Sequence, residues 1–270
     1  MRAGLRRLRP YLALGAVVIK RGLQYRLQFW TGLFGQIVLL VAYVAFWRAV
    51  YAGHASLGGL SARQTITYIL IARCVSPLLA SNIVEYLGFY LRFGYIATEL
   101  TRPVDLQAKF YVERLSGTAM LLLQQTVPVA LLSAVFFGLR LPADPWVWAA
   151  FALSLLAGYT VLFLLDWLIA CLAFYTTQTS GLSTMRDGVT TFFSGALIPL
   201  ALFPGPLRAV ADVLPFAQAL YAPVGLLSGI IAPQAAGRAL LIQAAWLAAL
   251  LVLSRLAFTR GLRALAVQGG

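Results

Sequence analysis

Very few residues of this chain could carry out acid–base, nucleophilic or metal chemistry. Among 270 residues there are 8 Asp and Glu, 1 His and 2 Cys, against 21 Lys and Arg. The single histidine, His54, cannot supply a His-based metal cluster or a Ser-His-Asp triad. A Walker-type phosphate loop is also missing, because neither Lys20 nor Lys109 follows a glycine. The sequence therefore predicts no catalytic, metal or ATP site in this chain.

The composition predicts that the chain resides in a membrane. Hydrophobic residues make up 61% of the sequence and charged residues 11%, whereas a soluble domain usually carries about 25% charge. This excludes a cytosolic enzyme, a disordered chain and a secreted disulfide scaffold. The net charge of +13 does not indicate nucleic-acid binding, since most of it flanks apolar segments.

Six apolar segments are predicted to be membrane-spanning helices. A bilayer core needs about 20 apolar helical residues, and no segment alternates as barrel strands do, so strands are not expected. The predicted spans are residues 30–51, 64–88, 115–138, 146–172, 187–203 and 236–256. The fold class is an all-α polytopic membrane protein with one transmembrane domain over residues 1–270, a bundle at 30–256 and a tail at 257–270.

Proline and glycine interrupt the apolar sequence after residue 193. Irregular backbone at membrane depth is tolerated only inside protein or beside a cavity. We therefore expect short outer re-entrant helices between spans five and six, which enter and leave on the same side. A gating or pathway-lining role and a purely structural re-entrance are alternative interpretations. The residues concerned are Ser194, Gly195, Pro199, Pro204, Pro206, Pro215 and Phe216.

Basic residues are distributed unevenly between the two sides of the predicted bundle. Six spans place both termini on one side, which holds 15 of the 21 Lys and Arg residues. The positive-inside rule makes this side cytoplasmic. Residues 1–28 contain seven of these charges, and no small-residue cleavage site follows the apolar run. They are predicted to form an amphipathic helix at the lipid interface rather than a signal peptide.

The cytoplasmic loop after span two, residues 91–107, mixes charged with apolar side chains. Ile96, Glu99, Leu100 and Pro103 recur at steps of three and four residues, so a short helix could present them on one face. Pro103 would end this helix, and Asp105 could cap the next one. A docking surface and an ordinary helix connector are both compatible with this pattern.

The charged residues within the predicted spans include Arg73, Glu85 and Asp166. Charges inside a membrane usually face protein or water. Glu85 and Asp166 are predicted at similar depth. Both could line an inward pathway that favours cationic or amphipathic cargo. Alternatively, each is locally hydrogen-bonded, with Asp166 bound to a hydroxyl or to an arginine near the inner side.

The order of these segments resembles the permease subunit of type-2 ABC transporters, in particular a compact six-helix bacterial permease family. The resemblance covers essentially the whole chain. It rests on the Arg-rich start with Gln24-Tyr-Arg26, the loop Gly94…Leu100-Thr-Arg-Pro-Val-Asp105, the run Ser194-Gly195…Pro199…Pro204, and Leu214-Pro-Phe216.

This resemblance implies a bacterial inner-membrane protein with an ATPase-coupling helix at about residues 93–103, seated in a cleft of a separate ATPase. It implies two ATPase copies that carry Mg-ATP, no cofactor in this chain, and two permease chains, identical or sister, around a central route. It also implies an outer re-entrant pair at about residues 204–235. The coupling residues would be Phe93, Tyr95, Ile96, Glu99, Leu100, Arg102, Pro103 and Asp105.

The leading functional interpretation is a permease subunit of an ATP-driven exporter, in which closure of the partner ATPases moves residues 93–103. A gradient-driven secondary transporter is one alternative. Such proteins often have broken helices in both halves, whereas here the breaks concentrate in the second half. A non-transporting membrane scaffold or assembly factor is the other alternative.

Overall fold

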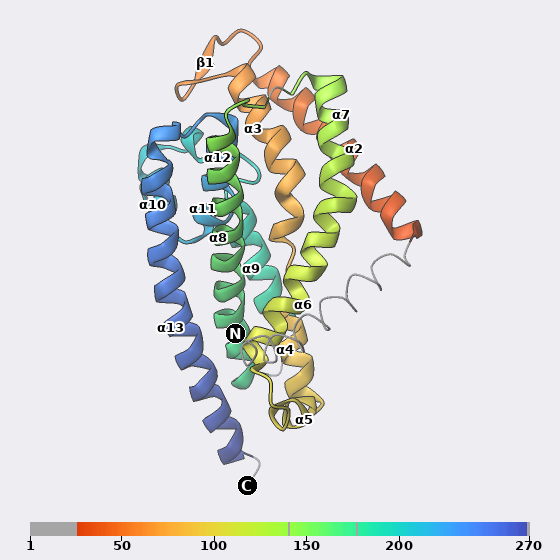
Figure 1. Cartoon of the computed structure of the whole chain (residues 1–270), viewed down its shortest axis with the longest axis vertical. Coiled ribbons are helices and arrows are strands. Elements are labelled where there is room, and N and C mark those ends of the chain that lie inside the picture. The colour runs from red at the N-terminus through yellow and green to blue at the C-terminus, as the bar shows by residue number, and fades with distance from the viewer. Residues whose placement is uncertain (1–25, 140, 177, 269–270) are drawn as a thin grey trace.

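The computed structural model describes residues 26–139, 141–176 and 178–268, and these residues are almost entirely helical (Figure 1). Five helical stretches are long and apolar enough to cross a membrane: Trp30–Val50, Ala62–Arg92, Leu106–Phe137, Pro145–Phe174 and Pro233–Ala264. The prediction of an all-α polytopic membrane protein is confirmed. The interfacial helix predicted for residues 1–28 lies almost wholly outside the described residues.

The first long helix, α2 (Arg26–Val50), is followed by a β-hairpin of β1 (Ser56–Leu57) and β2 (Leu60–Ser61). The expectation of no strands was wrong for this loop. Gly58 and Gly59 connect the strands with φ of 53° and 78°, a conformation that glycine adopts readily and that suits a tight hairpin. Strands of two residues are far too short to cross a membrane.

The second long segment is broken near its middle. It comprises α3 (Ala62–Val75), the 3₁₀ turn η1 (Ser76–Leu79) and α4 (Ile83–Arg92). The sequence predicted an uninterrupted helix over residues 64–88. Pro77 lies at the start of η1, where it removes a backbone donor and favours the interruption.

The third long segment runs from α6 (Leu106–Leu121) through the π-helical turn η2 (Leu122–Thr126) into α7 (Val127–Phe137). Between α4 and α6 lies the short helix α5 (Tyr95–Leu100). The membrane span was predicted to begin at residue 115, within a helix that starts after Asp105, and α6 does start at Leu106.

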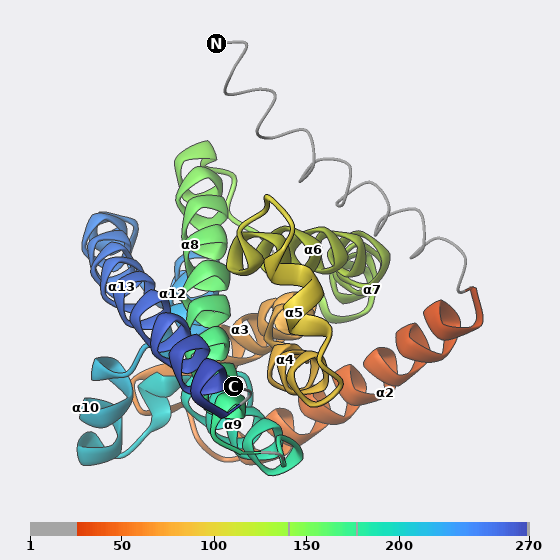
Figure 2. The same ribbon diagram turned by 90° about the horizontal axis from the view of Figure 1, so that it is seen from below.

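The fourth long segment is α8 (Pro145–Ala170) with the 3₁₀ turn η3 (Cys171–Phe174), and the last is α13 (Ala236–Gln268). These two helices lie side by side along most of their length (Figures 1 and 2). The last span was predicted to end at residue 256, but α13 continues to Gln268. The described part of the predicted tail is therefore helical.

The predicted fifth span, residues 187–203, is not one helix. α9 (Ser180–Phe193) begins earlier and ends before Ser194 and Gly195. Its 14 residues extend about 21 Å, which is less than a bilayer core of about 30 Å. The number of six spans therefore stays a prediction.

Short helices fill the sequence between α9 and α13, as its prolines predicted. They are η4 (Leu200–Leu202), α10 (Gly205–Val213), α11 (Phe216–Ala219), α12 (Tyr221–Ser228) and η5 (Pro233–Ala235). They cluster beside α8 near the end of the bundle that carries the β-hairpin (Figure 1). We call this the hairpin end, and the opposite end, which carries α5, the α5 end.

Each half of the bundle has its own apolar core. In the hairpin half, α2, α3 and α12 pack around residues such as Val44, Ile69 and Val224. In the α5 half, α4, α8 and α13 pack around Leu87 and Trp167. The break in the second segment lies between these two cores.

Candidate functional site

The helix α5 lies at one tip of the molecule, between the ends of α4 and α6 (Figures 1 and 2). The chain leaves α4 through Gly94, whose φ of 72° ends that helix and begins α5. After Leu100 the chain turns through Pro103 and enters α6 at Asp105. The sequence predicted a short helix here at about residues 93–103; α5 is shorter and ends at Leu100, before Pro103.

One face of α5 is fixed to the rest of the protein. Ile96 is buried in the core of the α5 half. The Glu99 carboxylate is also buried and lies 2.7 Å from Lys109 Nζ on α6 and 3.1 Å from Arg102 Nη1. Since Lys109 is itself buried, losing either partner of the Glu99–Lys109 pair would leave a buried charge with only a weaker or more exposed partner. These contacts attach α5 to α6.

The opposite face of α5 is exposed. Phe93 and Tyr95 are 60% and 52% exposed, and Leu100, Arg102 and Pro103 also lie at the surface. The short helix does not present Ile96, Glu99, Leu100 and Pro103 together: Ile96 and Glu99 are buried, whereas Leu100 and Pro103 are exposed. The helical spacing alone does not tell which of these residues the core covers.

Asp105 caps α6 and connects it to α13. Its Oδ1 accepts a hydrogen bond of 2.7 Å from the Ala108 backbone amide, and its Oδ2 pairs with Arg255 of α13. Burial acts to raise the pKa of the Asp105 carboxyl, but the hydrogen bonds from Arg255 and Ala108 outweigh this and hold the pKa below its usual value. The predicted cap is confirmed, whereas the link to Arg255 was not predicted.

Asp166 lies in a buried ion pair with Arg186 of α9. The guanidinium Nε is 2.5 Å from Asp166 Oδ1, and Nη2 is 2.6 Å from Oδ2. Both side chains are 2% exposed. Such a two-point contact is the strongest geometry for this pair. The arginine partner that the sequence offered as one alternative is therefore Arg186.

Arg186 also stabilises the break in the second segment. Its Nη1 donates to the Leu79 carbonyl oxygen at 2.8 Å and to Asp187 Oδ1 at 2.8 Å. The Leu79 carbonyl lies where the helix is interrupted, and a carbonyl without an intrahelical partner needs another donor inside a membrane. One arginine thus joins α8, α9 and the turn η1.

Glu85 lies apart from this cluster. It is exposed on α4 and lines a pocket of about 840 Å³ that does not include Asp166. The structure therefore does not bring the two predicted pathway residues into one cavity. Arg73, which also lies within a predicted span, donates to Ser76 Oγ at 3.1 Å and stacks 5.2 Å from the centre of the Tyr43 ring.

Ser194 and Gly195 lie in a close contact between three segments. Ser194 is fully buried, and the Gly195 carbonyl accepts a hydrogen bond of 2.9 Å from Tyr68 Oη of α3. Gly195 has φ of 82°, and a Cβ there would lie 2.5 Å from Tyr68 Oη and 3.3 Å from Tyr221 Cβ of α12. Only glycine fits this position without displacing its neighbours.

The prolines of the predicted gating segment mark helix starts. Pro199 precedes η4, Pro204 precedes α10, which has Pro206 in its first turn, and Pro215 precedes α11. A helix start is where the missing N–H of proline is tolerated. Next to Pro215, the Phe216 ring is largely buried, and its centre is 6.4 Å from that of Phe193.

A model described as ABC-2 family transporter protein matches residues 37–269 of the chain. The chain belongs to this family. It is thus a multi-pass membrane component of a transporter, and the family implies association with an ABC ATPase. No curated protein matches the chain.

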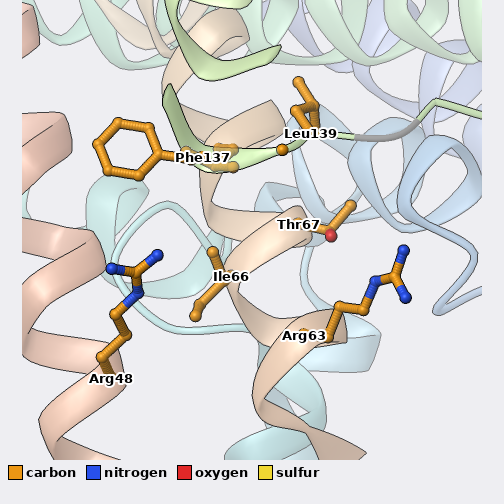
Figure 3. A pocket seen from close by; sticks show the side chains of 8 residues that line it. Arg48, Arg63, Ile66, Thr67, Phe137 and Leu139 are labelled. Carbon is orange, nitrogen blue, oxygen red and sulfur yellow. The ribbon is translucent and has the colours of Figure 1, made fainter. Parts of the chain in front are cut away.

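At the hairpin end of this ABC-2 family protein there is a second pocket, of about 400 Å³. Arg48 at the end of α2 and Arg63 at the start of α3 lie on either side of Ile66 and Thr67, with Leu139 across from them (Figure 3). The sequence reasoning did not single out this pocket. The sequence signal for this pocket was a pair of arginines, Arg48 and Arg63, at the end of the bundle where the positive-inside rule predicts few basic residues.

Proposed function

We propose that this ABC-2 family protein is the permease subunit of an ATP-driven exporter, and that a separate ATPase docks on α5. The observation that supports this most strongly is the two-sided character of α5. Its outer face exposes Phe93, Tyr95 and Leu100, while its inner face is fixed by Ile96 and the Glu99–Lys109 pair. A partner that binds such a helix can move the helices to which it is attached.

The displacement of α5 would pass into two membrane segments. Glu99 connects α5 to α6 through Lys109. The Phe89 ring of α4 stacks on the Tyr95 ring of α5, with 5.6 Å between ring centres. In this proposal Mg-ATP is bound and hydrolysed on the partner, and this chain contributes only the mechanical link.

The finer arrangement also belongs to this proposal. The chain crosses a bacterial inner membrane six times, with α5 and both termini on the cytoplasmic side. Two ATPase copies act on two permease chains, identical or sister, which share one route. The short helices at the hairpin end form the outer re-entrant region, where the contact of Ser194 and Gly195 with Tyr68 would control opening.

Co-purification with the ATPase tests the docking surface. The variants Leu100→Asp and Tyr95→Asp change exposed, uncharged residues of α5, so the isolated permease should stay folded. We expect each to reduce co-purification of a soluble ATPase from native membranes by at least about tenfold, since a charge placed in an interface is unfavourable by more than about 1.4 kcal/mol. The matched control is Arg208→Glu on α10, which is exposed and far from α5.

Three outcomes separate the candidate functions. Loss of the ATPase in both α5 variants and its retention in the control would support the exporter. Unchanged association in both α5 variants would contradict docking on α5. Transport that proceeds without any ATPase and follows an ion gradient would favour a secondary transporter, and the absence of both activities would favour a scaffold.

A further inference from the structure

The pocket beside Glu85 combines negative charge with aromatic surface. It has a volume of about 840 Å³ and lies between α4 and the start of α9. This volume is within the range of small-molecule sites, about 300–1,000 Å³. Its lining residues are Asn82, Glu85, Tyr86, Phe89, Tyr90, Arg92, Gln178, Thr179 and Ser180.

Glu85 differs from every other acidic residue of the chain. All eight lie in the described part, and the other seven have polar partners there, whereas Glu85 has no hydrogen bond or ion pair with any described residue. A carboxylate in an apolar helix is unfavourable unless it serves a partner. Because the Glu85 carboxylate has no such partner, it is available to bind a cation.

Aromatic rings lie next to this carboxylate. Tyr86 and Phe89 are 52% and 48% exposed. Phe89 is four residues after Glu85, so both lie on the same face of α4. The faces of such rings attract organic cations. Arg92, which also lines the pocket, lies two turns further along α4, about 10 Å from Glu85 by helical rise.

Residues just before α9 form the wall of the pocket opposite α4, and they pack closely against α4. A Cβ at Gly88 would lie 2.5 Å from Thr179 Cγ2, so the two segments are in direct contact beside the pocket. Thr179 is buried, whereas Gln178 and Ser180 are exposed. This contact makes the pocket a feature of the folded chain rather than of one helix surface.

Phe89 also connects the pocket to α5. Its ring stacks on Tyr95 with an interplanar angle of 22°, and its centre is 4.7 Å from that of Phe93. A ligand that packs against Phe89 would therefore contact the same aromatic group that carries the proposed ATPase-docking surface.

We propose that this pocket binds amphipathic organic cations with a broad apolar or aromatic body. Glu85 neutralises the charge, and Tyr86 and Phe89 pack against the apolar part. The identification of this ligand as cargo rests on the proposed exporter function, but the binding itself does not.

Equilibrium binding of tetraphenylphosphonium to the full-length chain in phosphatidylcholine nanodiscs tests the site without an ATPase. We expect saturable binding that Glu85→Gln weakens about tenfold, as loss of one nearby opposite charge predicts, and that Glu85→Asp largely retains. The matched control is Asp212→Asn, which removes one negative charge at the hairpin end and should leave binding unchanged. Neutral triphenylphosphine oxide should bind more weakly and respond little to Glu85→Gln.

The absence of saturable binding in the wild-type chain would overturn the proposal. So would equal binding by wild type and a folded Glu85→Gln, where folding is established by an unchanged thermal transition. Should Glu85→Gln not fold, Phe89→Leu decides in its place: a threefold or larger loss supports the proposal, and unchanged binding overturns it. If the wild-type chain binds the cation but recruits no ATPase, the exporter proposal is contradicted, while the binding site remains established.

Discussion

The α5 end and the hairpin end of the bundle differ in the ion pairs that join different helices, which in the described part of the chain lie at the α5 end. At the α5 end, charged pairs connect the elements: Glu99 with Lys109, Asp105 with Arg255, and Asp166 with Arg186. At the hairpin end, backbone segments approach one another closely at glycines. Gly158 of α8 meets the carbonyl oxygens of Gln218 and Ala219, and Gly195 meets Tyr68.

The difference follows from the elements that each end must hold. A six-residue helix such as α5 buries little apolar surface, so directional ion pairs are needed to fix its orientation. The short helices at the hairpin end lie against α8, and a residue without a side chain lets backbone approach backbone. The α5 end therefore depends on ion pairs, and the hairpin end depends on the close packing of backbone segments.

The largest expected effect is at the buried pair in the α5 half. Asp166→Asn would leave the buried Arg186 guanidinium with only the exposed Asp187 carboxylate as counter-charge, which is unfavourable by up to about 3–5 kcal/mol. Thermal unfolding in detergent should show a large loss of stability. The double variant Asp166→Leu, Arg186→Met should recover part of it, because an apolar pair replaces the ion pair, although the Leu79 carbonyl then loses its donor.

The control for this prediction is the exposed Arg208–Asp212 pair at the hairpin end, with 3.8 Å between Nε and Oδ2. Asp212→Asn should change stability by less than about 1 kcal/mol. Equal stability of Asp166→Asn and wild type would contradict the role of charge at the α5 end. If transport and ATPase stimulation are also unchanged in Asp166→Asn, Asp166 has no part in cargo recognition.

An intermediate effect is expected at Gly158, where α8 and α11 pack closely together. Gly158→Ala would place a Cβ against the Gln218 carbonyl and 2.9 Å from the Ala219 carbonyl oxygen, so α11 must move away from α8. Overpacking of this kind costs about 1–3 kcal/mol. Gly188→Ala on α9 is the matched control, since no atom lies within 4 Å of the added Cβ.

The same measurement of thermal unfolding distinguishes the two glycines. Gly188→Ala should be neutral or stabilising by up to about 1 kcal/mol, because alanine favours helix. A Gly158→Ala variant as stable as Gly188→Ala would mean that the hairpin end does not depend on close backbone approach.

The smallest effect concerns the exposed pair of Asp105 and Arg255. Because the folded-state pKa of Asp105 is below its usual value, the carboxylate stabilises the fold above the unfolded-state pKa of about 4. This stabilisation is lost as the pH falls through the folded-state pKa. Arg255→Ala removes one cause of the lowered Asp105 pKa. The variant should therefore lose less stability than the wild type as the pH falls below about 4.

Thermal transitions of wild type and Arg255→Ala, measured from neutral to acid pH, check this expectation. The difference between the two proteins should shrink as the pH falls. A constant difference would show that Arg255 contributes through packing alone.

Local features were predictable because their causes are local in sequence. Gly94 and Pro103 bound a short helix, Asp105 caps the next helix, and the spacing of Arg208 and Asp212 allows them to pair. The hairpin at Gly58-Gly59 had an equally local signal, which the expectation of no strands overlooked.

Features that depend on distant partners could not be predicted in the same way. The spacing within α5 could not tell that Ile96 and Glu99 face the core, because Lys109 and the rest of that core come from other helices. The break after η1 depends in the same way on a hydrogen bond from Arg186 to Leu79, 107 residues earlier.

The sequence by itself determined that this is a helical membrane protein with few groups for chemistry of its own, because hydropathy and residue types are properties of the chain alone. It also placed the helix-breaking prolines and the short helix after the second span. Only the tertiary structure decided which charged side chains have a partner of opposite charge. Asp166 and Glu85 look alike in sequence, yet one is buried against Arg186 and the other faces an open pocket, because partners of a charge are chosen by packing between distant segments.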